Sequence, residues 1–216
     1  MFEKEIAEAV LLRPMETWHA EEFAAHLDRA REHIRPWVGP AFITDSVDGA
    51  RATLQRYSLA TATDGARIYG LWQQGTLIGG VMFVTFDADW GICEIGCWLE
   101  PGAQGRGIVT AAVCCLLEWA FTHRGIVRAE WRCRADNEKS IAIAERLLMH
   151  SDGTLRSSWK FDGQRYDKRV FSLLQSEWPG EESALARAAV GRNPAPVNEP
   201  SPGSISGPHN SPVEAG

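Results

Sequence analysis

A glycine-rich segment at residues 104–110 (QGRGIVT) has the composition and spacing of a loop that binds a phosphate group. It lies between an expected strand and an expected helix, so its backbone N–H groups would gather at a helix N-terminus, where partial positive charge favours anions. Gly105 and Gly107 permit positive φ angles and carry no Cβ atom to keep a phosphate away from the backbone. Arg106 can add a charge-assisted hydrogen bond. An anionic cofactor is the natural occupant.

Other interpretations of this loop have different consequences. A P-loop would require GxxxxGK followed by Ser or Thr, and no lysine stands here. A dinucleotide fingerprint would begin at Gly105 and Gly107 and has Glu130 about 20 residues further on, although Thr110 occupies the place of its third glycine. A glycine-rich turn without a ligand also fits, because two glycines alone are weak evidence. The last two interpretations stay open beside acyl-cofactor binding.

The chain around the loop is predicted to combine short strands with amphipathic helices. Residues 66–74 and 76–86 have the pattern of a hairpin that turns at Gln74 and Gly75. Asp45 or Ser46 can cap the second helix. The predicted order is β-α-α-β-β-β-α-β-α-β-β, with strands at residues 6–14, 66–74, 76–86, 90–101, 128–135, 151–163 and 164–175, and helices at 17–33, 45–61, 108–123 and 137–150.

Length and composition predict one domain followed by a tail. The chain has 216 residues, of which 44% are hydrophobic and 23% charged, as in an ordinary globular domain. From residue 181 the sequence is rich in Pro, Gly, Ser and Asn, and such a segment cannot bury enough apolar surface to offset its ordering entropy. We therefore predict a domain at residues 1–180 and a disordered tail at 181–216, whose start, residues 181–190, can form a short helix.

Charge and the first residues limit the location and the partners. Glu3, Glu5 and Glu8 stand where a secretion signal would be basic, and the apolar runs are too short to cross a bilayer, so a cytoplasmic protein is expected. The net charge of −6 argues against nucleic acid or a membrane as partner, and it suits an amine substrate. A homodimer formed through sheet edges stays open.

The cysteines predict no disulfide framework and no metal site. There are five of them, and none forms a CxxC pair, which fits a reducing compartment. Cys93 and Cys97 share one face of an expected strand, but no histidine lies nearby to complete a metal site. We expect buried thiols. A cysteine nucleophile stays open, because its base partner cannot be placed from sequence.

Seven segments, read in order, resemble the RimJ/RimL-like branch of the GNAT superfamily of N-acetyltransferases. They are LLRPM, HIRPWVG, EIGCWLEP, QGRGIVTAAV, DNEKS, DGTLR and DKRVFSLL, and together they span residues 8–178. Cys97 departs from the branch, which often has an aromatic residue there. The resemblance implies an α+β fold: a mixed, mostly antiparallel, twisted and splayed sheet of about seven strands flanked by about four helices, with acyl-CoA between the fourth and fifth strands.

The resemblance also assigns roles to single residues. Asn137 matches the family residue that hydrogen-bonds the pantetheine arm, although either Asn137 or Asp136 could instead cap the following helix. Ser140 resembles a serine that protonates the leaving CoA thiolate, although a helix-surface serine is nearly as good an interpretation. Glu94, on the preceding strand, is our candidate general base, against the alternative of a solvated strand carboxylate. The backbone groups implied to hold the cofactor belong to Ile95, Gly96, Cys97, Trp98 and Leu99 on the strand, and to Gln104, Gly105, Arg106, Gly107, Ile108, Val109 and Thr110 in the loop and helix.

By this resemblance the protein is expected to transfer an acetyl group from acetyl-CoA, its co-substrate, to a primary amine. The acceptor would be a protein or peptide N-terminus or a small-molecule amine such as an antibiotic, and it would attack directly in a ternary complex without a metal ion. Two alternatives are a non-catalytic acyl-CoA-binding sensor and a dinucleotide-dependent oxidoreductase.

Overall fold

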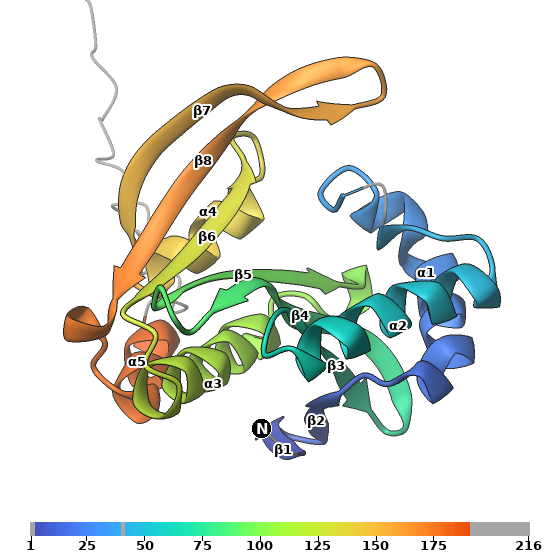
Figure 1. Cartoon of the computed structure of the whole chain (residues 1–216), viewed down its shortest axis with the longest axis horizontal. Coiled ribbons are helices and arrows are strands. Elements are labelled where there is room, and N and C mark those ends of the chain that lie inside the picture. The colour runs from blue at the N-terminus through green and yellow to red at the C-terminus, as the bar shows by residue number, and fades with distance from the viewer. Residues whose placement is uncertain (1–2, 40–41, 191–216) are drawn as a thin grey trace, which may run out of the picture.

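The protein folds around one eight-stranded sheet. The computed structural model describes residues 3–39 and 42–190. The strand order is β1-β2-β3-β4-β5-β6-β8-β7, and every neighbouring pair is antiparallel except β5 and β6 (Figure 1). The strands are β1 (Lys4–Ala7), β2 (Val10–Pro14), β3 (Arg67–Gln73), β4 (Thr76–Asp87), β5 (Ile92–Leu99), β6 (Arg128–Arg134), β7 (His150–Phe161) and β8 (Gln164–Leu174). The mixed, mostly antiparallel sheet predicted from the sequence is confirmed.

The described residues form five α-helices, one more than predicted. They are α1 (Ala20–Ile34), α2 (Val47–Ala62), α3 (Ile108–His123), α4 (Glu138–Arg146) and α5 (Glu181–Val190). The first begins later than expected, because residues Thr17–His19 form a 3₁₀ turn before α1. Ser46 caps α2 by accepting a hydrogen bond from the Gly49 backbone N–H at 3.1 Å, which decides between the two predicted capping residues.

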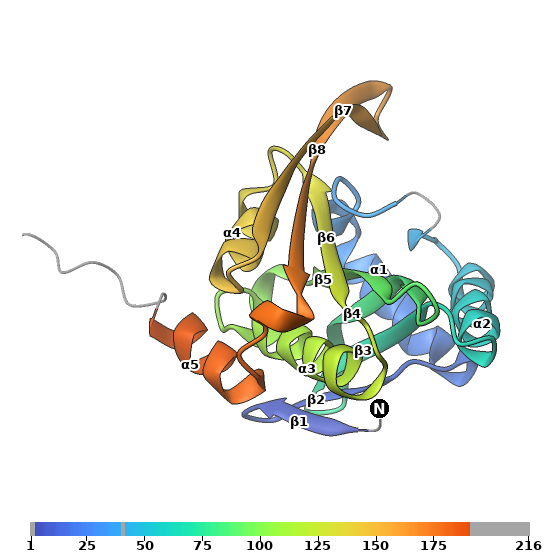
Figure 2. The same ribbon diagram turned by 60° about the vertical axis from the view of Figure 1, so that its left-hand side comes forward.

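Apolar residues on the two faces of the sheet form two cores. Leu71 and Val81 face α3, whereas their chain neighbours Trp72 and Met82 face α1 and α2, as expected from the two-residue period of a strand. Figure 2 shows α3 on one face with α5 beside it, and α1 and α2 on the other. Twelve of the sixteen residues of α3 are buried, so this helix is the centre of the larger core.

The N-terminal run was predicted as a single strand at residues 6–14, and this is wrong. A two-residue turn at Glu8 and Ala9 divides it into the antiparallel strands β1 and β2. Ala9 adopts a φ of 57°, and its backbone N–H donates to the Glu5 carboxylate at 3.1 Å. This local hydrogen bond supports a left-handed conformation that alanine otherwise disfavours. The sheet therefore has eight strands in place of about seven.

The β3–β4 turn agrees with its prediction. Gln74 and Gly75 have φ angles of 50° and 78°, the left-handed pair that a two-residue hairpin loop requires. At the other end of the sheet, β7 and β8 form a long hairpin that extends beyond the rest of the sheet (Figure 1). Its tip reaches the end of α1, where the Arg35 guanidinium lies 5.4 Å from the centre of the Phe161 ring.

Helix α5 lies in the segment that we predicted as tail. It forms the short helix allowed at residues 181–190, and Ala184 and Ala188 are buried against the larger core and α3. The Glu118 carboxylate on α3 accepts hydrogen bonds from the Trp178 indole at 2.8 Å and from the Glu181 backbone N–H at 3.1 Å. These ten residues are therefore packed. Residues 191–216 lie outside the described residues, so the predicted tail beyond α5 stays a prediction.

Candidate active site

A cleft opens where β5 and β6 separate. Their parallel pairing runs from Ile92 with Arg128 to Ile95 with Trp131 and ends there, although both strands continue. Beyond that point β5 pairs only with β4, and β6 only with β8. The resulting cleft has a volume of about 1220 Å³ and is lined by α1, α2, β4, β5, β6, α4, β7 and β8 and by the loop before α3. The predicted splay of the sheet is therefore present.

The glycine-rich loop forms one end of this cleft. Gly105 and Gly107 have φ angles of 77° and 78°, as the sequence suggested. Gly107 stands at the N-cap of α3 and has no side chain to occupy the first N–H groups of the helix. The backbone at Ile108, Val109 and Thr110 lines the cleft. This helix N-terminus therefore offers unoccupied donors and partial positive charge to an anion.

Arg106 does not extend into the cleft, contrary to expectation. Its guanidinium donates to the side-chain oxygen of Gln73 at 2.8 Å, at the end of β3, and Arg106 is absent from the residues that line the cleft. Only its backbone belongs to the loop.

Three other polar side chains, which we did not predict, surround the loop. The Gln104 carboxamide contacts His33 Nε2 at 2.5 Å and accepts from Lys139 Nζ at 2.6 Å. Arg146 donates to the Thr110 hydroxyl at 3.3 Å, and all of these residues line the cleft. Burial and the nearby Lys139 lower the pKa of His33, so its imidazole is neutral near pH 7. Lys139 and Arg146 therefore supply the cationic charge that Arg106 was expected to supply.

The free edge of β5 forms one wall of the cleft. Residues 96–99 have no partner strand on the β6 side, so their backbone groups on that side face the cleft. An extended amide-containing chain can pair with such an edge as an additional strand would. Trp98 is fixed behind this edge by a hydrogen bond from its indole N–H to His26 Nε2, at 3.1 Å. Burial raises the pKa of Cys97 to about 12 and also raises that of Cys133, which disfavours a thiolate nucleophile here.

Helix α4 places Asn137 and Ser140 on the opposite wall. Asn137, not Asp136, caps the helix: its side-chain oxygen accepts from the Ser140 backbone N–H at 3.1 Å, while Asp136 pairs with Arg134 at 2.5 Å. The Asn137 carboxamide therefore keeps its NH₂ group and the second lone pair of its oxygen for a ligand. The Ser140 hydroxyl oxygen accepts from the Trp131 indole at 2.9 Å, and the hydroxyl also forms a hydrogen bond with the Cys133 side chain.

Glu94 lies on β5, one residue before the pairing with β6 ends. It is half-buried in the cleft wall, and burial raises the pKa of its carboxyl group, while Arg132 and Lys168 oppose that rise. The Arg132 guanidinium lies 3.6 Å from the carboxylate. Opposite it, β4 has a bulge between Phe83 and Thr85 that turns Val84 to the cleft. A half-buried carboxylate with a raised pKa is suited to accepting a proton near neutral pH.

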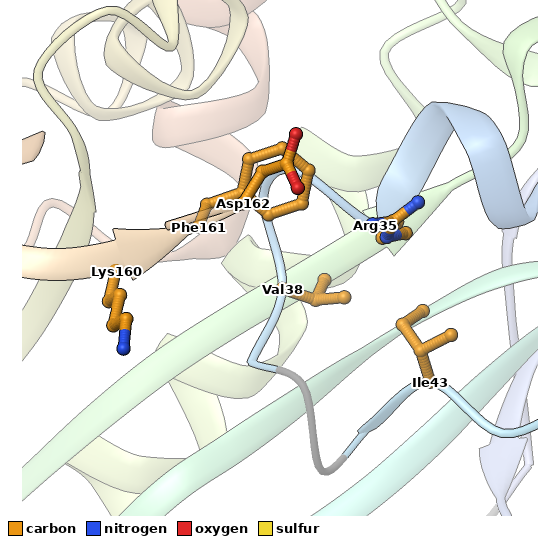
Figure 3. Close-up of a pocket in the computed structure, with 6 residues that line it drawn as sticks. All are labelled: Arg35, Val38, Ile43, Lys160, Phe161 and Asp162. Carbon is orange, nitrogen blue, oxygen red and sulfur yellow. The ribbon is translucent and has the colours of Figure 1, made fainter. Parts of the chain in front are cut away.

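A smaller pocket of about 280 Å³ lies between the end of α1 and the tip of the β7–β8 hairpin (Figure 3). It shares Val38 with the larger cleft. Its other lining residues are Arg35, Ile43, Lys160, Phe161 and Asp162.

Within residues 3–39 and 42–190, no three His, Cys, Asp or Glu side chains come close enough to hold a metal ion. None of the helices in the described part of the chain has the length and apolar character of a membrane span. All five cysteines are free thiols, and all but Cys97 are buried.

Comparison with known proteins finds relatives in sequence and in fold. A protein of Bacillus subtilis (strain 168) that carries the name "Putative ribosomal N-acetyltransferase YdaF" is 28% identical over 187 residues, which cover 84% of this chain and all of that protein. The ribosomal-protein-serine acetyltransferase of Escherichia coli (strain K12) is 27% identical over 128 residues, 59% of this chain and 70% of that protein. The structure of RimL, a ribosomal L7/L12 α-N-protein acetyltransferase in complex with coenzyme A, superimposes with a TM-score of 0.75 at 21% identity, covering 80% of this chain and 97% of RimL.

The family model for the acetyltransferase (GNAT) domain matches residues 9–150, more than half of the chain. These residues include the free edge of β5, the glycine-rich loop and the start of α3, and both candidate catalytic residues. The chain therefore belongs to the GNAT acetyltransferase family and is an acetyl-CoA-dependent N-acetyltransferase.

Proposed function

We propose that this enzyme acetylates the N-terminal amine of a protein or peptide. The observation that carries the proposal is the position of Glu94 and Ser140 on opposite walls of one cleft, on either side of the point where β5 and β6 separate. The relatives named as ribosomal and ribosomal-protein N-acetyltransferases support a protein acceptor. The family match leaves the dinucleotide-dependent oxidoreductase without support.

The cofactor half of the cleft would hold acetyl-CoA through groups of three kinds. The first N–H groups of α3, with Lys139 and Arg146, are suited to the pyrophosphate. The free edge of β5 and the NH₂ group of Asn137 are suited to the amide groups of the pantetheine arm. When bound, acetyl-CoA supplies an activated acetyl thioester. Backbone N–H groups of β5 at the start of the splay can stabilise the oxyanion formed by direct amine attack.

Glu94 would act as the general base. An attacking amine must lose a proton, and the Glu94 carboxylate can take it directly or through one water molecule. Burial raises the pKa of Glu94, which makes the carboxylate a better proton acceptor, while the charges of Arg132 and Lys168 oppose that rise.

Ser140 would act as the general acid. Its oxygen accepts from the Trp131 indole at 2.9 Å, and its hydroxyl hydrogen would turn from the Cys133 sulfur to another acceptor when a ligand supplies one. The departing CoA sulfur is such an acceptor when the pantetheine arm lies along β5, opposite α4. The serine then recovers a proton from solvent, and Glu94 releases the amine proton to solvent after the product leaves.

The first experiment is a calorimetric titration with acetyl-CoA, followed by turnover of short peptides with a free N-terminal serine or alanine. Glu94→Gln and Ser140→Ala should each bind acetyl-CoA like the wild type but lower kcat by about a hundredfold, the usual loss when a general acid or base is removed. Glu145→Gln, an exposed carboxylate on α4, is the matched control and should leave kcat unchanged.

The pH profile provides a second readout. As a base, Glu94 must be deprotonated, so activity should fall as the pH drops through its pKa, which burial raises above the ordinary value. This acid limb should be lost in Glu94→Gln. Acetyl-CoA binding without turnover of any peptide or small amine would contradict the proposed function and favour an acyl-CoA sensor.

A further inference from the structure

The acceptor half of the cleft carries more positive than negative charge. This half, defined here as the lining residues from α2, β4, β7 and β8 together with Glu94 and Arg132, contains the cations Arg56, Arg132 and Lys168. Glu94 is its single carboxylate among the described lining residues. The overall charge of the chain is −6, so this local excess of cations runs against the charge of the whole protein.

Lys168 is the half-buried cation among these three, whereas Arg56 and Arg132 are exposed. Arg132 is held by Glu130 at 2.5 Å and approaches Glu94 at 3.6 Å, whereas Lys168 forms no ion pair with any residue that the structure describes. Its ammonium group lies 4.8 Å from the centre of the Trp159 ring. Lys168 is half-buried and lines the same cleft as Glu94 and Cys133, and its charge acts to lower the pKa of both groups.

The fold explains why this ammonium group is fixed there. Lys168 lies on β8 opposite Arg134 of β6 and Leu155 of β7, in the middle of a paired strand. Arg134 is engaged with Asp136 at 2.5 Å and stacks over Tyr166, so it does not compete for a ligand in the same place. A half-buried lysine that no carboxylate of the described residues holds in an ion pair is available to an anionic group of a ligand.

We infer that Lys168, with Arg132, selects acceptors that carry an anionic group a few bonds from the reacting amine. The inference rests on the proposed function, because it assumes that the amine lies at Glu94. The ammonium of the acceptor then faces the one carboxylate in this half of the cleft, and a carboxylate of the acceptor faces Lys168. That carboxylate belongs either to an acidic side chain near a peptide N-terminus or to a free amino acid.

The test measures acceptor binding to protein saturated with CoA, which cannot turn over. Three peptides that begin Ser-Glu, Ser-Gln and Ser-Lys and are otherwise identical are titrated by calorimetry into the wild type, Lys168→Gln and Lys168→Glu. The wild type should bind the glutamate peptide about fivefold more tightly than the glutamine peptide, the size expected of a partly screened ion pair. Lys168→Gln should remove this preference, and Lys168→Glu should reverse it in favour of the lysine peptide.

Lys160→Gln is the matched control, since Lys160 is an exposed lysine of the same hairpin that does not line the cleft. It should keep the preference for the acidic peptide. Glycine and glycinamide form a second pair of ligands. If glycine binds, glycinamide does not, and the binding is lost in the Lys168 variants, the carboxylate belongs to a free amino acid. If the preference for the glutamate peptide is lost in the Lys168 variants, the carboxylate belongs to an acidic side chain.

Equal affinity for the three peptides with no Lys168-dependent glycine binding, or a preference that survives in Lys168→Gln, would overturn the inference. A lysine that only tunes Glu94 would behave differently again: Lys168→Gln would then lower kcat for all acceptors equally, without changing their relative affinities. A Lys168-dependent preference in binding, without acetylation of any peptide, would support the inference and contradict the proposed function.

Discussion

Charged side chains at the two ends of the cleft serve opposite demands. Lys139 and Arg146 surround the glycine-rich loop, where a pyrophosphate needs positive charge. Glu94 lies one residue before the end of the β5–β6 pairing, where an ammonium group needs a proton acceptor. Because the α4 side chains reach the loop while Glu94 is fixed on β5, the two charges stay apart, and neither neutralises the other.

Substitution of Arg146 and of Arg106 tests which of the two guanidinium groups near the loop contributes to acetyl-CoA affinity. Arg146→Gln should weaken acetyl-CoA binding about tenfold, the loss expected for one charge-assisted hydrogen bond to a phosphate. Arg106→Gln should change the affinity little, because its guanidinium bonds Gln73 away from the cleft. Calorimetry at low and high salt measures both, and the Arg146 effect should shrink as salt rises. A larger loss in Arg106→Gln would mean that its side chain turns toward the cofactor on binding.

At the scale of elements, local signals in the sequence predicted most of the fold. The helix cap at Ser46 and the hairpin turn at Gln74 and Gly75 depend only on hydrogen bonds and φ angles within a few residues, so the local sequence is enough to predict them. The turn at Glu8 and Ala9 could not be predicted in this way, because it lacks the Gly, Asn or Asp that usually marks a two-residue turn.

The site was less predictable than the elements, because side-chain direction depends on tertiary structure. The loop sequence contains Arg106, but the path of the backbone turns that side chain away. Lys139 and Arg146, seven residues apart on α4, share a helix face, and this spacing is a signal that could have found them. That their face meets the loop, and that β5 separates from β6 after Ile95, follows only from the packed sheet. The roles given to Glu94, Ser140 and Asn137 remain predictions.

Alanine substitutions at two glycines in left-handed turns can separate a loss of stability caused by backbone strain from a loss of acetyl-CoA affinity. Gly105 in the loop and Gly163 in the β7–β8 turn have φ angles of 77° and 76°, and neither has an atom within 4 Å of the place that a Cβ would take. Alanine at either position should therefore lower the free energy of unfolding by about 1 kcal/mol. Only Gly105→Ala should also weaken acetyl-CoA binding, because its Cβ and any backbone shift lie at the anion site. Urea unfolding and calorimetry measure the two effects, and equal loss of affinity in both variants would argue against a phosphate at this loop.

At the scale of the whole molecule, α5 connects the C-terminal part of the fold to its start. Glu181 pairs with Lys4 on β1 at 2.7 Å, and the Glu118 carboxylate on α3 holds both Trp178 and the first turn of α5. These contacts lie on the face of the sheet that α3 covers, whereas α1 and α2 cover the other (Figure 2). The cleft needs α3 in place, since its N-terminus forms the loop end. Helix α5 therefore supports the site without contacting it.

Two truncations locate the end of the folded domain. Removal of residues 191–216 should leave the free energy of unfolding unchanged, if that segment is the disordered tail predicted from its composition. Removal of residues 181–216 should cost on the order of 2 kcal/mol, because Ala184, Ala188 and the partly buried Leu185 lose their apolar contacts with α3. It also leaves Glu118 with one partner fewer and Lys4 without its carboxylate. Chemical unfolding followed by tryptophan fluorescence measures both. Equal stability of the two truncated proteins would place the domain boundary at residue 180, and a loss already present in the shorter truncation would show that residues beyond α5 also pack.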